Sequence, residues 1–434
     1  MSGTVIALIF LGLLLVLLVV RVPIAIALIT TSVGGIAALR GMDTLWAVVG
    51  KLPYDFAAHW SLSAIPMFLL MGTIAFRGGL TASLFSACRI WFGRLPGGLA
   101  IAANFASAMF AAASGSSLAT AAAMGRIAVP EMLKSGYQPG LATGTVAAAG
   151  TLGAMIPPSI AFIVYGWYTG VPIGQLLIAG ILPGILTAVA YSATVVIRVL
   201  IDPSLAPRST ERPTWGQSLS AFVSVWPIPV LIFAVIGLLY SGFTTATEAG
   251  AIGAVAALLI CALRGTLTLD VVRNSIRDAV TSTTSILIIA VGASLLSKFL
   301  VLAGLPQTMG RIVTEGEATV FMVIGFTVVL YLVLGMFLDP IGVMLVTLPI
   351  LLPVFDALDL NLIWMGVVVV KLIEIGLLTP PVGLNVYVVK SVVDPRIPVE
   401  EIFKGVMWFL AAEVVITALL IFIPEISLWL PSHM

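Results

Sequence analysis

Two pairs of adjacent prolines lie inside long apolar stretches of this 434-residue chain. Pro157 and Pro158 stand in LGAMIPPS, and Pro380 and Pro381 stand in LLTPPVGL. Proline has no backbone N–H, and its ring crowds the carbonyl four residues earlier in a helix. Each pair is therefore predicted to break a helix and to release carbonyl oxygens from its hydrogen bonds.

The carbonyls predicted to be free are those of Gly153 and Ala154 before the first pair, and those of Gly376 and Leu377 before the second. An unpaired carbonyl in hydrocarbon costs several kcal/mol. Such a break is tolerated only where protein, water or an ion satisfies it. Facing carbonyls at mid-membrane depth are good ligands for sodium, so this pattern indicates cation binding.

Two other apolar segments carry small polar residues at their middle. The segment AAASGSSLAT, residues 111–120, and the segment LGMFLDPIG, residues 334–342, are both predicted to be tips of helical hairpins. Helix ends leave free N–H groups and carbonyls, and helix N-termini favour anions. The groups that these tips offer are Ser114, Gly115, Ser116, Ser117 and Thr120 in the first, and Gly335, Asp339 and Pro340 in the second.

The composition sets the environment of these groups. Hydrophobic residues make up 60% of the chain and charged residues 9%, with a mean hydropathy of +1.19. A soluble globular protein has about a quarter charged residues, and apolar stretches of helical length are not those of a membrane barrel. The chain is therefore predicted to be a multi-spanning helical membrane protein, and its first apolar stretch a retained span. A net charge of +1 gives no reason to expect a nucleic-acid partner.

The two cysteines, Cys88 and Cys261, lie far apart in the sequence. They have neither a metal-binding spacing nor the pattern of a disulfide framework.

The apolar segments recur with a displacement of 223 residues. The six segments of the first half, near 4–20, 22–39, 61–76, 98–133, 141–169 and 175–200, map onto apolar segments near 227–243, 245–262, 284–299, 321–356, 364–392 and 398–423. In the same register Pro130 coincides with Pro353, Gly153 with Gly376, and the first proline pair with the second. The chain is therefore predicted to contain two repeats, residues 1–201 and 218–434, joined by a cytoplasmic linker at 202–217.

Basic residues predict the orientation of these repeats. Five crossings and one re-entrant hairpin in each half require the halves to be inverted. This topology leaves Arg40, Lys51 and Arg311 on one side and places fifteen basic residues on the other: Arg21, Arg77, Arg89, Arg94, Arg126, Lys134, Arg198, Arg208, Arg212, Arg264, Arg273, Arg277, Lys390, Arg396 and Lys404. The basic side is cytoplasmic by the positive-inside rule, so both termini are expected to face outward.

These features predict an all-α membrane protein with two inverted-topology repeats. Each repeat has about five transmembrane helices and one re-entrant helical hairpin, at about 98–133 and about 321–356. Inverted repeats whose discontinuous helices meet near the midplane are typical of secondary transporters.

Several motifs along the chain are similar to those of one transporter family. The segments IPMFLLMGTIAFRGGLTASL, AAASGSSLATAAAMG, LGAMIPPS, LLTPPVGLNVYV and FLDPIGVMLVTLPILLPV together resemble the large membrane subunit, of DctM type, of tripartite ATP-independent periplasmic (TRAP) transporters. The resemblance covers nearly the whole chain. It implies an elevator-type, sodium-coupled importer of organic acids such as C4-dicarboxylates, keto acids, sugar acids or sialic acid.

The resemblance also implies where sodium and substrate bind. Sodium ions, as coupling ions rather than cofactors, are expected at Ser114, Gly115, Ser116, Gly150, Thr151, Gly153, Ala154, Gly335, Met336, Asp339, Gly376, Leu377 and Thr379. Substrate is expected at Ser116, Ser117, Thr120, Ser159 and Asn385.

Two protein partners follow from the same resemblance. They are a separate four-helix membrane subunit of DctQ type and a periplasmic substrate-binding protein of DctP type. The expected location is the bacterial inner membrane, as a multi-pass protein with periplasmic termini.

Structural interpretations of the same residues stay open. The serine cluster and Asn385 could serve helix packing, the proline pairs could be kinks alone, and Asp339 could only cap a turn. Lys371 and Glu374, three residues apart, are expected to form a structural ion pair, and Glu248 to form a capping box with Thr245.

Other functions fit less well. The two histidines, His59 and His433, give no basis for a buried hydrolase site, and no phosphate-binding loop of a pump is present. The alternatives that remain are a related inverted-repeat anion transporter that needs no binding protein, and a passive channel or structural subunit.

Overall fold

The computed structural model describes residues 2–207, 214–316 and 319–434. Every regular element in these ranges is helical, and nine helical segments among them are long and apolar enough to cross a membrane. The predicted linker at 202–217 lies partly outside the described residues, at 208–213. Its described end already belongs to a helix that begins at Trp215.

Each half contains a short helix, then a hairpin of two helices, then an interrupted helix. The first half consists of α1 (Gly3–Val19), α2 (Ile24–Ala57), α3 (Ala64–Arg77), α4 (Leu80–Phe92), α5 (Gly98–Ser114), α6 (Ser117–Lys134), α7 (Pro139–Gly150), α8 (Leu152–Met155), α9 (Ile160–Thr169), α10 (Ile173–Ala179) and α11 (Ile181–Ile201). The second consists of α12 (Trp215–Ser224), α13 (Pro227–Ile232), α14 (Leu238–Tyr240), α15 (Ala246–Leu263), α16 (Leu269–Leu302), α17 (Leu305–Glu315), α18 (Val320–Gly335), α19 (Pro340–Ala357), α20 (Leu362–Gly376), α21 (Leu384–Val392), α22 (Val399–Phe422) and α23 (Glu425–Leu428).

The chain turns back on itself twice, at positions that share the 223-residue register. Ser116 caps the N-terminus of α6, where its Oγ accepts a hydrogen bond from the N–H of Ala119. Asp339 caps the N-terminus of α19 in the same way, through the N–H of Gly342. Short polar side chains at these positions satisfy N–H groups that a new helix leaves open.

The capping box predicted at the start of α15 is confirmed. The backbone N–H of Thr245 donates to Glu248 at 2.8 Å, and the N–H of Glu248 donates to the Thr245 hydroxyl at 3.4 Å.

Two helices are longer than their apolar stretches predict. Helices α2 and α16 each contain 34 residues, whereas hydropathy predicts spans near 22–39 and 284–299. In α2 the additional part follows a kink at Gly41, whose φ is +78°. In α16 the additional part is polar, and its Asp278 pairs with Arg77 of α3. A hydropathy search misses such extensions because they are not uniformly apolar.

Helices α4 and α17 were not predicted from the sequence. These helices are short and amphipathic, and they occupy matching places in the two halves, directly before the hairpins. With 13 and 11 residues, they are too short to cross a membrane.

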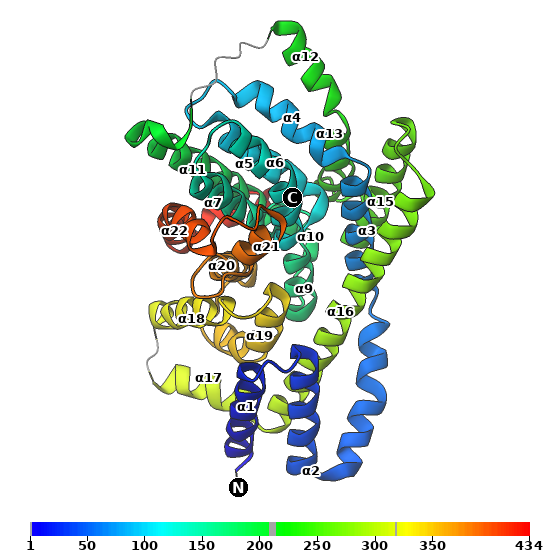
Figure 1. Cartoon of the computed structure of the whole chain (residues 1–434). Helices are drawn as coiled ribbons and strands as arrows, with labels where there is room; N and C mark the ends of the chain where they lie inside the picture. Colours follow the sequence, from blue (N-terminus) through cyan, green and yellow to red (C-terminus); the bar gives the residue numbers. More distant parts are fainter. Residues whose placement is uncertain (1, 208–213, 317–318) are drawn as a thin grey trace.

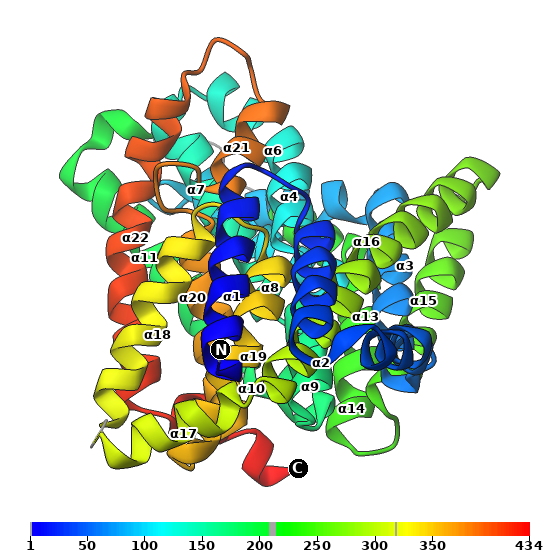
Figure 2. The same cartoon turned by 90° about the horizontal axis from the view of Figure 1, so that it is seen from below.

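The helices form two groups, which contact each other where α3 packs on α5 and α16 packs on α19. Figures 1 and 2 show α3, α15 and α16 together along one side of the molecule. One group pairs the halves crosswise, because α2 packs along α16 and α3 packs along α15. The other group contains the hairpins, α5 with α6 and α18 with α19, and the interrupted helices α7 to α9 and α20 to α21. This second group positions the residues predicted to bind ions and substrate.

Candidate functional site

The first hairpin tip is a tight turn with its own hydrogen bonds. Gly115 ends α5 with φ of +61°, a left-handed conformation that favours glycine. The hydroxyls of Ser114 and Thr120 lie 2.9 Å apart, and the Thr120 hydroxyl donates to the Ser116 carbonyl at 2.8 Å. Ser114 and Thr120 are buried, so the predicted ion-binding and substrate-binding hydroxyls face the interior.

This tip packs directly on the first helix break. The N–H of Ile160 donates to the carbonyl of Gly115 at 3.2 Å. A Cβ atom on Gly115 would lie 2.4 Å from the Pro158 oxygen, and one on Gly153 would lie 2.4 Å from the Ser116 oxygen. The tip and the break therefore meet backbone to backbone.

The first break leaves the predicted carbonyls unpaired. Helix α8 ends at Met155 and α9 begins at Ile160, with a cis peptide bond between Pro157 and Pro158. None of the hydrogen bonds within the described residues ends on the carbonyl oxygen of Gly153 or Ala154. Ser159, fully buried, caps α9 by accepting from the N–H of Phe162 at 3.3 Å. Two free acceptors therefore lie beside the hairpin tip.

The second break differs from its predicted form. Helix α20 ends at Gly376 and α21 begins at Leu384, again around a cis Pro–Pro bond. The prediction of free carbonyls at Gly376 and Leu377 is wrong, because the first accepts from the N–H of Thr379 and the second from the N–H of Asn385, both at 3.1 Å. The chain folds back over the end of α20, and the turn supplies the donors that a straight helix would lack.

The second hairpin tip contacts the second break at another point. A Cβ on Gly376 would lie 2.6 Å from the Cα of Gly335, so α18 and α20 touch through two glycines. Met336 follows α18, and its N–H donates to Leu332, while Asp339 caps α19. No hydrogen bond in the described part of the chain joins Met336 or Asp339 to the second break.

Two other predicted ligands have local partners. The Thr379 hydroxyl donates to the carbonyl of Ile375 at 2.7 Å. The Thr151 hydroxyl donates to the carbonyl of Ala148 at 2.7 Å and lies 3.2 Å from the Tyr191 hydroxyl. Both hydroxyls serve helix ends, and Thr151 points toward α11 rather than toward the hairpin tip.

Asn385 from the second half reaches the first half. It is fully buried, and its Nδ2 donates to the carbonyl of Ala147 at 3.4 Å. A Cβ on Gly150 would lie 3.2 Å from this Nδ2 and 3.2 Å from the Ser117 oxygen. The structure therefore gathers Ser117, Gly150 and Asn385 in one place; we call these three residues, with Gly153 and Ala154, the inner cluster.

The expected ion pair between Lys371 and Glu374 is wrong. Lys371 Nζ lies 2.6 Å from an oxygen of Glu413 on α22 and donates to Thr187 of α11 at 2.9 Å. Glu413 also accepts from the hydroxyl of Tyr191. A lysine side chain is long enough to reach a facing helix, where its charge pairs with a carboxylate that is equally buried.

Glu374 instead contacts the first hairpin. Its Oε1 accepts from the Ser117 hydroxyl at 2.7 Å, between α20 and the start of α6. Reasoning from the sequence missed this residue as part of the site. The available signal was a carboxylate only two residues before Gly376 inside an apolar span.

Hydroxyls, free carbonyls and a carboxylate in a dry interior can bind an alkali cation. Hard cations prefer oxygen ligands, and the buried oxygens here come from both halves of the chain. The starts of α6 and α9 add partial positive charge that favours an anion nearby.

Comparison with known proteins identifies the family. The family model described as the DctM component of the tripartite ATP-independent periplasmic transporter matches residues 11–426. The chain belongs to this DctM family. The C4-dicarboxylate TRAP transporter large permease protein DctM of Pseudomonas aeruginosa is 35% identical over 393 residues, which is 90% of each protein.

Two further comparisons concern a relative named DctMQ and a solved structure with a similar fold. The isethionate TRAP transporter permease protein DctMQ of Oleidesulfovibrio alaskensis is 30% identical over 431 residues, covering 95% of this DctM chain and 64% of that protein. The solved structure of Neisseria gonorrhoeae MtrF covers 89% of this chain with a TM-score of 0.62 at 14% identity, and 86% of that chain is matched. The predicted DctM-type family and all-α transporter fold are thus confirmed, and the family is one of transport permeases rather than enzymes.

Proposed function

We propose that this DctM chain is the transport subunit of a sodium-coupled secondary importer that takes up an organic acid anion. One observation carries the proposal: the first hairpin tip packs against a helix break whose Gly153 and Ala154 carbonyls accept no hydrogen bond within the described residues. Unpaired carbonyls in a membrane need a partner, and sodium fits oxygen ligands.

Sodium would enter the space between the first tip and the first break. Gly153, Ala154 and the hydroxyl groups of the tip would hold it, and the tip would be ordered when the ion is present. A ligand stabilises the state for which it has the higher affinity. The bound ion would therefore favour the arrangement in which the anion site is complete.

The anion would bind beside this ion. Ser116, Ser117 and Ser159 stand at the starts of α6 and α9, where helix dipoles and N–H groups favour negative charge. Asn385 supplies an amide from the other half. The relatives' printed names include C4-dicarboxylate and isethionate, which support an organic anion without selecting one for this chain.

Transport would follow an elevator mechanism. The group that contains the hairpins and broken helices would slide as a body against the group built from α2, α3, α15 and α16. The support is that α2 packs along α16 and α3 along α15, while the hairpin helices pack on the interrupted helices.

Two partners complete the proposed transporter. One is a small membrane subunit of DctQ type, which the name of the DctMQ relative supports. The other is a soluble binding protein of DctP type, which would deliver the anion from the periplasm. The chain itself would lie in the bacterial inner membrane with both termini outside.

Uptake into liposomes tests this function. The chain is reconstituted with its small subunit, and a panel of radiolabelled organic acids is offered with the binding protein under imposed gradients. We expect accumulation only with an inward sodium gradient and only when the binding protein is present. Uptake driven equally by a proton gradient would refute sodium coupling, and full uptake without the binding protein would refute that dependence.

A further inference from the structure

Glu374 is a buried carboxylate with one oxygen unused. Glu374 is 1% exposed and lies on α20, two residues before the end of that helix. Oε1 accepts from the Ser117 hydroxyl at 2.7 Å, whereas Oε2 has no hydrogen-bond partner among the described residues. A charged oxygen without a partner in a dry interior is costly.

The buried charges around Glu374 do not balance. Within the described residues, the fully buried acids and bases are Lys371, Glu374 and Glu413. Lys371 is already paired with Glu413, at 2.6 Å and with both side chains at most 1% exposed. When Glu374 is ionised, one negative charge remains, and no further buried cation among the described residues neutralises it.

A second unused acceptor lies nearby. The Oδ1 of Asn385 is buried and has no hydrogen-bond partner in the described part of the chain. The Nδ2 of the same Asn385 amide and the carbonyl oxygen of Ser117 each lie 3.2 Å from the position that a Cβ on Gly150 would occupy. Ser117 therefore links Glu374 to the inner cluster, where Asn385 and Gly150 meet the first hairpin.

A purely structural role does not explain the carboxylate. The Ser117 hydroxyl needs only one acceptor, and a neutral glutamine would provide it without burying a charge. A carboxylate is useful here if something positive is added to the site. Its contact with Ser117 places that charge between the start of α6, in the first hairpin, and the end of α20, which leads into the second break.

We propose that Glu374 is the anionic ligand of a sodium site formed with Ser117 and Asn385. This inference rests on the proposed sodium coupling and adds to it the residue that supplies the charge. Sodium bound to Glu374 Oε2 neutralises the excess negative charge and joins the first hairpin to the second half of the chain. The ion thereby fixes Ser117, the first residue of α6, in the geometry that the anion site needs.

Sodium-dependent stability of the purified full chain tests the proposal. The unfolding midpoint is measured while sodium chloride replaces choline chloride at constant ionic strength, for wild type, Glu374→Gln and Glu374→Asp. We expect a saturable rise for wild type. For Glu374→Gln we expect that rise to be lost, or its half-maximal sodium concentration to increase about tenfold or more, because ligand charge sets affinity. Glu374→Asp keeps the charge but withdraws the carboxylate, so its half-maximal concentration should lie between the two.

Glu131→Gln is the matched control. Glu131 lies on α6 in a surface ion pair with Arg89, and its side chain is 40% exposed. The substitution of Glu131 should leave the sodium titration unchanged.

If Glu374→Gln does not fold, Glu374→Asp and Ser117→Ala test the proposal instead. Both variants keep the negative charge of residue 374, and both should still weaken sodium binding.

The outcomes separate this inference from the proposed function. If Glu374→Gln responds to sodium as wild type does, the role of Glu374 is overturned while sodium coupling stays intact. The same conclusion follows if both Glu374→Asp and Ser117→Ala respond as wild type does. A wild-type chain whose unfolding midpoint ignores sodium overturns the site and the proposed coupling together. A loss confined to the Glu374 and Ser117 variants supports the site.

Discussion

At the scale of single residues, a fully buried ion pair organises three helices. Lys371 of α20 contacts Glu413 of α22 and Thr187 of α11, and Tyr191 of α11 donates to the same glutamate. Removing charges from water is expensive, and their attraction offsets that cost only with good geometry and further hydrogen bonds. Here the two hydroxyl groups provide those hydrogen bonds.

Breaking this pair should destabilise the protein strongly. Glu413→Gln or Lys371→Met leaves a buried charge without its partner, which costs about 3–5 kcal/mol of unfolding free energy. The double substitution should cost less than the two single changes combined, because both charges are then gone. Reversible unfolding in detergent, followed by circular dichroism or by tryptophan fluorescence, gives the four free energies.

A surface pair provides the comparison. Lys404 lies 3.8 Å from Glu401, and its side chain is 78% exposed. Lys404→Met should cost under about 1 kcal/mol. The double substitution could instead lower the free energy of unfolding by as much as Lys371→Met and Glu413→Gln do together. That result would show that the two buried charges do not depend on each other.

At the scale of elements, glycines decide how closely helix ends approach. Gly115 at the first tip touches the carbonyl of Pro158, and Gly335 at the end of α18 touches Gly376 at the end of α20. Each contact brings a hairpin helix onto the interrupted helix of the same half. A side chain at these points would separate the elements that form the site.

Gly115→Ala should damage the first tip. The φ of +61° disfavours any L-residue by about 1–2 kcal/mol, and the new methyl group would lie 2.4 Å from the Pro158 oxygen. We expect lost uptake together with a lower unfolding midpoint. Gly170→Ala is the control, because Gly170 has φ of +76° but no atom within 4 Å of a Cβ. Equal effects of the two substitutions would mean that contact with the break is unimportant.

Gly376→Ala should separate α18 from α20. Its methyl group would lie 2.6 Å from the Gly335 Cα, and overpacking of this kind costs about 1–3 kcal/mol. Gly325→Ala, in α18 with open space at its Cβ position, should be neutral or stabilising. Thermal unfolding of both variants checks this, and a Gly376→Ala protein as stable as wild type would contradict the close approach.

At the scale of the whole molecule, hydropathy and proline positions predicted most elements. The apolar segments and their 223-residue displacement located the hairpin helices and the interrupted helices within a few residues. Helices α4 and α17 escaped detection because they are only 13 and 11 residues long. The partner of Lys371 could not be predicted, because Glu413 follows it by 42 residues and only packing brings the two together.

The candidate site was predictable in part. Serines and glycines of the first tip were found from their place in an apolar segment, and the structure puts them against the first break. The second break could not be foreseen, since its Gly376 and Leu377 carbonyls are satisfied by N–H groups of a turn whose path the sequence does not reveal.

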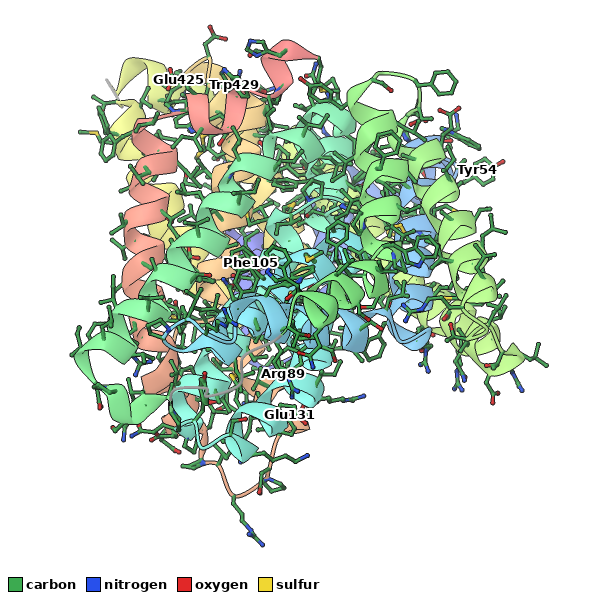
Figure 3. All side chains as sticks on the ribbon, turned by 90° about the horizontal axis from the view of Figure 1, so that it is seen from above. Tyr54, Arg89, Phe105, Glu131, Glu425 and Trp429 are labelled. Carbon is green, nitrogen blue, oxygen red and sulfur yellow. The ribbon has the colours of Figure 1, made fainter. Side chains whose placement is uncertain are left out.

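The labelled residues near the C-terminus lie far from two residues of the first hairpin region. Figure 3 shows Glu425 and Trp429 at one end, and Arg89 and Glu131 toward the opposite end. The pairs Arg77 with Asp278 and Arg89 with Glu131 use basic residues that were all predicted to be cytoplasmic. The first of these pairs places Arg77 of the first half beside Asp278 of the second.

Cysteine labelling in spheroplasts checks this orientation. Single cysteines replace Ser432 or Ser135, both exposed, in a chain whose buried Cys88 and Cys261 are changed to alanine. A membrane-impermeant maleimide should label position 432 in intact spheroplasts and position 135 only after permeabilisation. The reverse pattern would contradict outward-facing termini.

The central claim is that an ion fills the space between the first hairpin tip and the first helix break. The most direct measurement is a high-resolution cryo-electron microscopy map of the transporter, recorded in sodium and again in choline. The account predicts density within coordination distance of the Gly153 and Ala154 carbonyls in sodium, and its loss in choline. A sodium map that resolves ordered water elsewhere but shows these carbonyls bonded to protein alone would contradict it.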